Sequence, residues 1–380
     1  MEAVWASLLL CTLATAQTHT PAEALALEQQ GKLPEATVAW QAVTRQNPRD
    51  AAAFARLGVV LSKQQKYPEA IAAYKKAIAL NPKLPGLQLN LGLAEFKQGN
   101  FQSAIAPFRA VLASDPHNTQ ARTLLGLSYY GTQQYAEAAK YLTPVAQADP
   151  ANLELHQVLA HSCLWAKLYS CALDEFRHVQ QTNPDSASAH MLSGEALDGL
   201  DQTADAIAEF QAAIQVAPRE PNAHFGLGYL YWKSHQYDEA KAEFEREVAL
   251  DPGHAQAWAY LGDIEMKRNH LEEAVSFLRK SIQLKPDLRI ASIDLGAVLA
   301  LQNRYEDAAA ELQHAVALDP SEPDAHYRLG RVYQEMGKTA EAQKEFAQVR
   351  ELHKKADEDM VRKMSSSPPA LNSPEKERPN

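Results

Sequence analysis

Proline recurs along this chain every 34 residues, at Pro48, Pro82, Pro116, Pro150, Pro184, Pro218, Pro252, Pro286 and Pro320. An alanine column keeps the same interval without a break, through Ala36, Ala70, Ala104, Ala138, Ala172, Ala206, Ala240, Ala274, Ala308 and Ala342. A glycine column does so with only two replacements, at Gly58, Gly92, Gly126, Gly194, Gly228, Gly262, Gly296 and Gly330. A length of 380 residues suggests two or three globular domains. Columns that stay in phase over so many periods predict a row of equivalent units instead.

Each unit is predicted to be a pair of antiparallel helices. In the segment HFGLGYLYW, His224, Leu227, Gly228 and Tyr231 are separated by three or four residues, which is helical spacing. The residue before each Pro is driven out of the helical region, so the Pro ends the second helix. A glycine within a helix costs about 1 kcal/mol relative to alanine. Its recurrence therefore predicts close contact between helices, and no segment shows strand alternation.

These columns resemble the tetratricopeptide repeat family. The unit 255–288 carries Trp258, the pair Leu261-Gly262, Ala274 and Pro286 at the positions of the family pattern. The resemblance covers residues 17–356 as ten units. It implies an all-α, right-handed superhelical solenoid of about ten antiparallel helix-pair repeats, whose first helices line a concave groove. In such arrays each unit contacts only its neighbours.

The N-terminal segment MEAVWASLLLCTLATAQ is predicted to be a secretory signal peptide of residues 1–16. Its apolar stretch is too short to span a bilayer, and the small residues Ala14 and Ala16 match a cleavage site. Cleavage after Ala16 would leave Gln17 as the first residue of a periplasmic or secreted protein without a transmembrane span. The segment has Glu2 and no Lys or Arg, so an uncleaved apolar helix in a cytoplasmic protein, or a mis-assigned start, is the alternative.

The C-terminal unit 323–356 departs from the pattern because Lys354 stands where Pro is expected. Its second helix is therefore predicted to continue to about Met364. The segment 365–380 is rich in Pro and Ser, a composition typical of disordered tails.

The composition argues against several classes of function. The chain has 47 acidic and 37 basic residues, a formal net charge of −10, and lacks the clustered basic residues that bind nucleic acid. It shows no nucleophile–base–acid set and no Gly-rich phosphate loop, so we expect no catalytic residues, no cofactor and no metal. One column holds four histidines, His156, His190, His224 and His326. They lie whole repeats apart and cannot share one metal ion, so we expect packing residues that replace an aromatic ring.

Two cysteines remain after signal cleavage, Cys163 and Cys171. They fall late in the first helix and early in the second helix of one unit, and an antiparallel pair brings such positions together. A disulfide is expected if the compartment is oxidising, and two buried free thiols are the alternative.

A second face of the first helices carries large side chains. Phe225, Tyr229 and Trp232 lie at helical spacing, about 100° around the helix from the packing face. The resemblance places this face in the concave groove. The predicted peptide-binding residues are Phe96, Tyr130, Trp165, Phe225, Tyr229, Trp232, Tyr260 and Met266. Rings in a groove are typical anchors for peptides, but they can also be no more than the groove wall.

Two specialised grooves of the family are missing. The columns of the Lys and Asn clamp for C-terminal carboxylates hold Ala55, Val59, Gly86 and Asn90. The column of the Asn ladder holds Arg56, Asn90, Leu124, Val158, Leu192, Gly226, Tyr260, Asp294 and Arg328.

The sequence therefore favours a non-catalytic scaffold that binds a partner protein or peptide in its groove, exported to a bacterial periplasm or envelope. A cytosolic regulatory adaptor, or a docking subunit of an enzyme complex whose chemistry lies on another chain, are the alternatives.

Overall fold

A computed structural model describes residues 19–366, and all regular structure in that range is helical. The all-α prediction is confirmed, with twenty helices and no strand between these two residues. The predicted signal peptide lies outside the described residues, as does the C-terminal tail from residue 367 on. The chain forms two compact units, one ending at Pro184 and the other beginning at Asp185.

The first compact unit contains α1 (Pro21–Gln29), α2 (Leu33–Gln46), α3 (Ala51–Lys63), α4 (Tyr67–Leu80), α5 (Leu87–Lys97), α6 (Phe101–Ser114), α7 (Thr119–Gly131), α8 (Tyr135–Ala148), α9 (Leu153–Trp165) and α10 (Tyr169–Thr182). The second contains α11 (Ala187–Gly199), α12 (Thr203–Val216), α13 (Ala223–Lys233), α14 (Tyr237–Leu250), α15 (Ala255–Lys267), α16 (Leu271–Leu284), α17 (Arg289–Leu301), α18 (Tyr305–Leu318), α19 (Pro323–Glu335) and α20 (Thr339–Ser366). The sequence predicts an end of the last helix near Met364. No helix between residues 19 and 366 combines the length and apolar character needed to cross a membrane.

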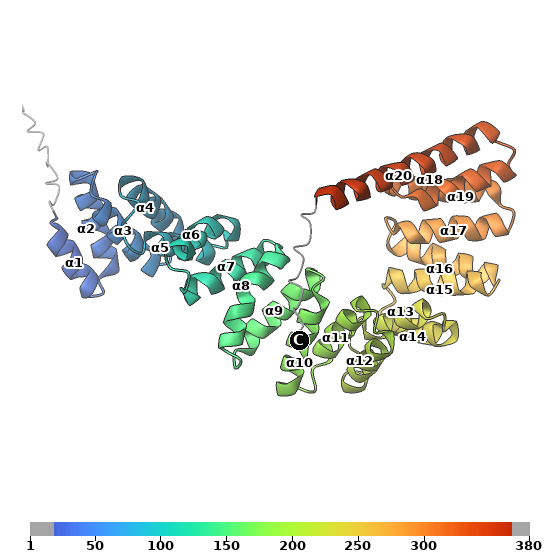
Figure 1. The fold of residues 1–380 in the computed structure, drawn as a ribbon, viewed down its shortest axis with the longest axis horizontal. Helices are drawn as coiled ribbons and strands as arrows, with labels where there is room; N and C mark the ends of the chain where they lie inside the picture. Colours follow the sequence, from blue (N-terminus) through green and yellow to red (C-terminus); the bar gives the residue numbers. More distant parts are fainter. Residues whose placement is uncertain (1–18, 367–380) are drawn as a thin grey trace, which may run out of the picture. The chain divides into compact units, whose positions relative to one another are not determined.

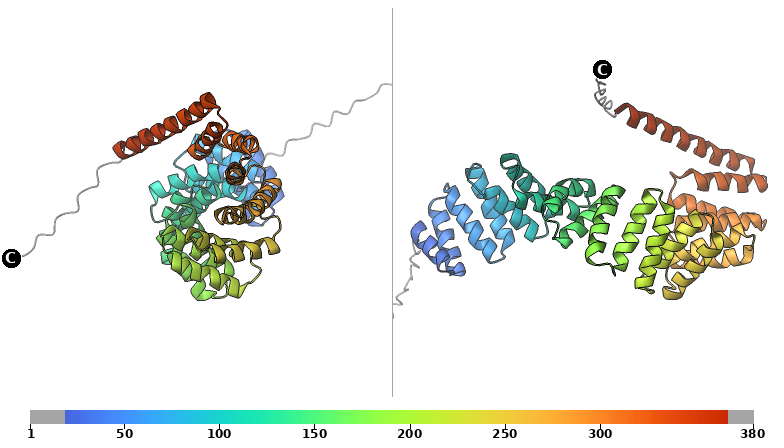
Figure 2. Two further views of the ribbon diagram at one scale, coloured as in Figure 1. Left: turned by 90° about the vertical axis from the view of Figure 1, so that its right-hand side faces the viewer. Right: turned by 60° about the horizontal axis from the view of Figure 1, so that its bottom comes forward.

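Within each compact unit, helices that follow one another in the chain pack side by side as successive pairs (Figure 1, Figure 2). The first helix of a pair can also contact the first helix of the next pair. Such contacts join α11 to α13, α15 to α17, and α17 to α19. These first helices therefore lie side by side within a compact unit, and residues from neighbouring repeats meet on the face that they form.

The glycine column is explained by close contact between the two helices of one repeat. A Cβ atom at Gly228 would lie 2.9 Å from the ring of Phe244, which lies sixteen residues later in the chain. The same contact joins Gly58 to Tyr74 at 2.6 Å. The remaining members of the column meet a Phe or Leu at the same interval. The alanine column is almost completely buried. Any larger side chain in either column would push the helices of a pair apart.

The turn between the two helices of a repeat contains one residue in the left-handed region. These residues also recur every 34 positions, at Gly31, Gln65, Gly99, Gln133, Lys167, Asp201, His235, Asn269, Asn303 and Gly337. Their φ values lie between 58° and 82°. Only glycine adopts this region without a steric cost. The turn nevertheless keeps the same backbone conformation in the repeats that have another residue there.

Candidate functional site

Four of the predicted groove residues form one cluster on α13 and α15, which we call the ring face: Phe225, Tyr229, Trp232 and Tyr260. The ring of Tyr260 lies 5.0 Å from that of Trp232 and 5.9 Å from that of Tyr229. Tyr229 and Trp232 stack with their centroids 6.1 Å apart. All four side chains are half-buried, so each keeps a surface on which another molecule can pack.

The ring face rests on the core through Phe244, a fully buried residue of α14. Tyr260 stacks on Phe244 with a centroid distance of 5.1 Å and an angle of 10° between the rings. Phe225 lies 5.7 Å from the same ring. Phe244 therefore fills two roles, because it covers Gly228 within its own repeat and supports the rings of two first helices.

The start of α13 is shaped by Glu247, a buried residue of α14. Its carboxylate accepts the backbone N–H groups of Asn222 at 3.2 Å and of Phe225 at 3.0 Å. These N–H groups have no partner within the helix, and a negative charge is favourable at this end of the helix dipole. Asn222 itself is left-handed, with φ of 67°. The sequence does not reveal this role, because Glu247 lies at ordinary helical spacing from Ala240 and Phe244.

A hollow of about 230 Å³ lies beside the ring face, between α11 and α13. Its lining includes Met191, Glu195 and Asp198 from α11, and Phe225 and Tyr229 from α13. Asp198 is paired with the ammonium group of Lys233 at 2.8 Å. Glu195 has no hydrogen bond or ion pair among the described residues, and withdrawal of water by its surroundings raises the pKa of its carboxyl group.

Two buried carboxyl groups lie on the other side of the ring face. Asp263 accepts the indole N–H of Trp232 at 2.6 Å and also pairs with Lys267. Asp294 on α17 is 7 % exposed and has no hydrogen bond or ion pair within the described part of the chain. Burial, together with the neighbouring carboxylate of Asp263, raises the pKa of Asp294 to about 7. Burial raises the pKa of Tyr260 to about 12, and the neighbouring Tyr229, Asp263 and Asp294 add to the rise.

The other predicted groove residues lie apart from the ring face. In the first compact unit, Tyr130 and Trp165 stack at 5.9 Å, and Trp165 is 49 % exposed. Phe96 packs edge-on against Phe101 at 5.2 Å. Met266 follows the ring face in sequence but packs against the core cluster that runs from its own repeat into the next ones. Their role in binding stays a prediction.

Cys163 at the end of α9 and Cys171 at the start of α10 are joined by a disulfide in the structure, with the sulfur atoms 2.01 Å apart. Their Cα atoms are 5.8 Å apart, a separation that a disulfide spans readily.

The histidine column has a polar role that the expectation of simple packing residues missed. Each ring Nδ1 lies 2.5–2.6 Å from a Glu carboxylate on the second helix of the same repeat. The pairs are His156–Glu175, His190–Glu209, His224–Glu243 and His326–Glu345. The spacing of nineteen residues between His and Glu is the sequence signal that reveals them. The pairs hold two helices of one repeat together, and each pair is separate from the next.

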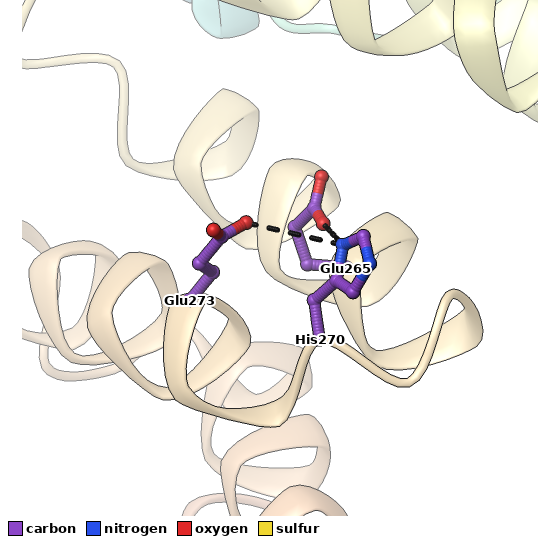
Figure 3. A group of neighbouring side chains, drawn as sticks. All are labelled: Glu265, His270 and Glu273. Carbon is purple, nitrogen blue, oxygen red and sulfur yellow. Dashed lines mark hydrogen bonds and ion pairs between the residues drawn. The ribbon is translucent and has the colours of Figure 1, made fainter.

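One group among residues 19–366 has donor atoms close enough for a metal ion, Glu265, His270 and Glu273 (Figure 3). The Nδ1 atom of His270 lies 2.6 Å from Glu265 and 4.0 Å from Glu273. However, the ammonium group of Lys241 lies 2.8 Å from Glu265. Burial by itself would raise the pKa of Glu265, but hydrogen bonds from Lys241 and His270 outweigh it and lower the pKa.

The same arrangement recurs five repeats earlier, where the buried Glu95 pairs with Lys75 at 2.9 Å and with Asn100 at 2.9 Å. In both repeats a lysine from the preceding second helix already neutralises the carboxylate. We therefore interpret Glu265 as part of a structural ion pair.

Comparison with known proteins identifies the repeat. Models described as "Tetratricopeptide repeat" match residues 89–152 and 225–289, 129–196 and 199–246, and 324–356, and one described as "TPR repeat" matches 60–99 and 296–337. No curated protein sequence matches the chain.

Among solved structures, the chain is similar to YrrB, described as a TPR protein with an unusual peptide-binding site. The identity is 20%, the match covers 47% of this chain and 91% of YrrB, and the TM-score is 0.40. It is also similar to MamA, with 21% identity over 43% of this chain and 96% of MamA, and a TM-score of 0.40.

Proposed function

The chain belongs to the tetratricopeptide repeat family, and on that premise we propose that it is a non-catalytic scaffold which binds an extended segment of a partner protein. The family supports protein interaction as the general role. The proposal adds the place, which is the ring face on α13 and α15.

One observation carries this assignment. Four large rings from two neighbouring first helices contact one another across the boundary between two repeats, and each ring is only half-buried. The packing within a repeat is already satisfied by the glycine and alanine columns and by Phe244. Trp and Tyr are enriched among the residues that dominate binding energy at interfaces. A partner that lies across α13 and α15 would contact both repeats at once.

We expect Trp232→Ala and Tyr229→Ala to weaken binding of peptides selected on the wild-type protein from a displayed library of random twelve-residue sequences. Loss of an anchor that contributes about 2 kcal/mol corresponds to roughly a 30-fold increase in Kd. The measurement is Kd by fluorescence anisotropy, with circular dichroism to establish that each variant is folded.

Trp258→Ala is the matched control. Trp258 also lies on α15, but its ring packs at 5.6 Å against Phe277 of the second helix in the same repeat. It should lose stability and keep its affinity. Unchanged affinity in Trp232→Ala and Tyr229→Ala would mean that these rings are only the wall of the groove.

Export is the second part of the proposal. It is supported by the signal-like segment 1–16 and by the disulfide between Cys163 and Cys171, since disulfides persist mainly in oxidising compartments. We expect mass spectrometry of unreduced, alkylated protein from its native cells to find Gln17 as the first residue and one peptide pair linked through these cysteines. Two alkylated cysteines in a chain that still begins at Met1 would contradict export.

A further inference from the structure

The strongest unexplained feature near the ring face is the carboxyl group of Asp294. It is more than nine-tenths buried and has no hydrogen bond or ion pair among the described residues. An unpaired buried acid is costly, because burial removes the water that stabilises its charge. A ligand that carries a cation or a hydrogen-bond donor would reduce this cost, so such a group in a binding region indicates which ligands bind there.

The cations around Asp294 are already engaged elsewhere. The charged groups that face it are Asp263 and Lys267 from α15, and Asp324 and Arg328 from α19. Lys267 pairs with Asp263, and the guanidinium group of Arg328 is bonded to Asp324 at 3.1 Å. The helices α15, α17 and α19 therefore surround this position with carboxylates, and both cations near it are already paired with other carboxylates.

Asp294 adjoins the ring face and is continuous with it. Asp263, its neighbouring carboxylate, accepts the indole N–H of Trp232. The phenol of Tyr260 is influenced by both carboxyl groups, which places all three within electrostatic range of one another. Rings and a free carboxyl group therefore occur side by side at the junction of α13, α15 and α17.

A second carboxylate without a partner lies at the opposite side of the same rings. Glu195 lines the hollow beside Phe225 and Tyr229 and has no cation within ion-pair distance among residues 19–362. Its neighbour Asp198 is already bound to Lys233. The ring face is thus bordered by a buried carboxyl group on α17 and by an exposed one on α11, and neither is paired with a cation in the described part of the chain.

An arginine or lysine side chain suits this combination of groups. A guanidinium plane stacks on aromatic rings and donates two parallel hydrogen bonds to a carboxylate. An apolar or acidic side chain at this place would leave Asp294 unpaired and would remove its remaining contact with water, and a neutral polar side chain would supply a hydrogen bond but no compensating charge. The acidic net charge of the chain also favours the approach of a cationic partner.

We propose that the segment bound on the ring face is basic, and that an Arg or Lys side chain of the partner packs on the rings of Trp232 and Tyr260 and pairs with Asp294. This inference rests on the proposed binding function and specifies the chemistry of the partner.

The test uses the full-length protein and a displayed library of random twelve-residue peptides, selected in parallel on wild type and on Asp294→Asn. Wild type should enrich sequences with Arg or Lys, and Asp294→Asn should lose that enrichment. An enriched arginine peptide should bind Asp294→Asn at least tenfold more weakly than wild type. The same peptide with its Arg replaced by Gln should bind both proteins equally.

Glu306→Gln is the matched control, because it removes one exposed negative charge from α18, the second helix of the same repeat. Its affinity for the arginine peptide should stay within twofold of wild type. The pH dependence adds a separate readout. Since a cation binds the ionised form of Asp294, affinity should rise from pH 6 to pH 8 in wild type, and that rise should be absent in Asp294→Asn.

The outcomes separate the two proposals. Selected peptides that need Trp232 but are not basic, or whose affinity does not change in Asp294→Asn, would overturn the basic-partner inference and leave the ring face as the binding site. A library that yields no binder to wild type would overturn both.

Discussion

Replacing Phe244 by alanine is expected to lower the free energy of unfolding by about 3–5 kcal/mol, the usual cost of deleting a buried phenyl ring. Phe244 has no exposed surface and covers the backbone of Gly228. It also supports Tyr260 at 5.1 Å, so the cavity would open toward the ring face as well as within the repeat. Equilibrium urea unfolding followed by circular dichroism measures the effect.

Phe244→Leu is the control for this prediction. Leucine fills the equivalent position against Gly126, Gly262 and Gly296 in other repeats. The leucine variant should therefore lose less than about 1.5 kcal/mol. An alanine variant with the unfolding midpoint of wild type would show that the ring is not needed to hold the two helices together.

Asp294→Asn is expected to stabilise the protein at alkaline pH and to change its stability little at acidic pH. The pKa of Asp294 is raised from 3.8 to about 7 in the folded state. The unfolded chain thus gives up this proton at lower pH than the folded chain does. Below about pH 4 this group adds no penalty to the free energy of unfolding of wild type. The stability falls as the pH rises from about 4 to about 7, and it is constant above pH 7.

The penalty above pH 7 is about 4 kcal/mol, because a rise of roughly three pKa units corresponds to 1.36 kcal/mol each. The buried amide of asparagine and the protonated carboxyl group of aspartic acid carry a similar burial cost. Asp294→Asn should therefore recover most of this penalty at pH 8, a gain of about 3–4 kcal/mol. Unfolding in urea at pH 5 and pH 8 measures both values. A difference between the two proteins that is the same at both pH values would contradict the assignment. Glu306→Gln, which removes an exposed carboxylate of α18 outside the charged groups around Asp294, is the control and should lack this pH dependence.

The period of 34 residues predicted the helix pairs because small residues are required wherever two backbones touch. That requirement repeats with the fold, and each member of the glycine column meets a ring or a leucine in its own repeat. The ring face was also predictable in part. Phe225, Tyr229 and Trp232 share one side of a single helix, and spacing alone places them together.

The polar groups of the site were not predictable in the same way. Asp294 was visible in the sequence only as a departure from an asparagine ladder. Its lack of a partner depends on Lys267 and Arg328 being engaged by acids four residues away on their own helices, α15 and α19. That both helices bring these engaged groups beside Asp294 on α17 follows from packing across repeats. Met266 lies 34 residues after Trp232, yet it packs against the core cluster that its own repeat shares with the repeats after it. Periodicity predicts which face a residue occupies, but not what its neighbours leave unsatisfied.

The left-handed turn residue at the same place in every repeat bears on how such a chain changes over generations. Because each helix pair is closed by the same backbone geometry, a pair that is duplicated or deleted whole carries its own turn with it. Length can then vary in steps of one repeat, while point substitutions on the first helices alter what is recognised. The length of the array and the identity of its partner can therefore change independently of each other.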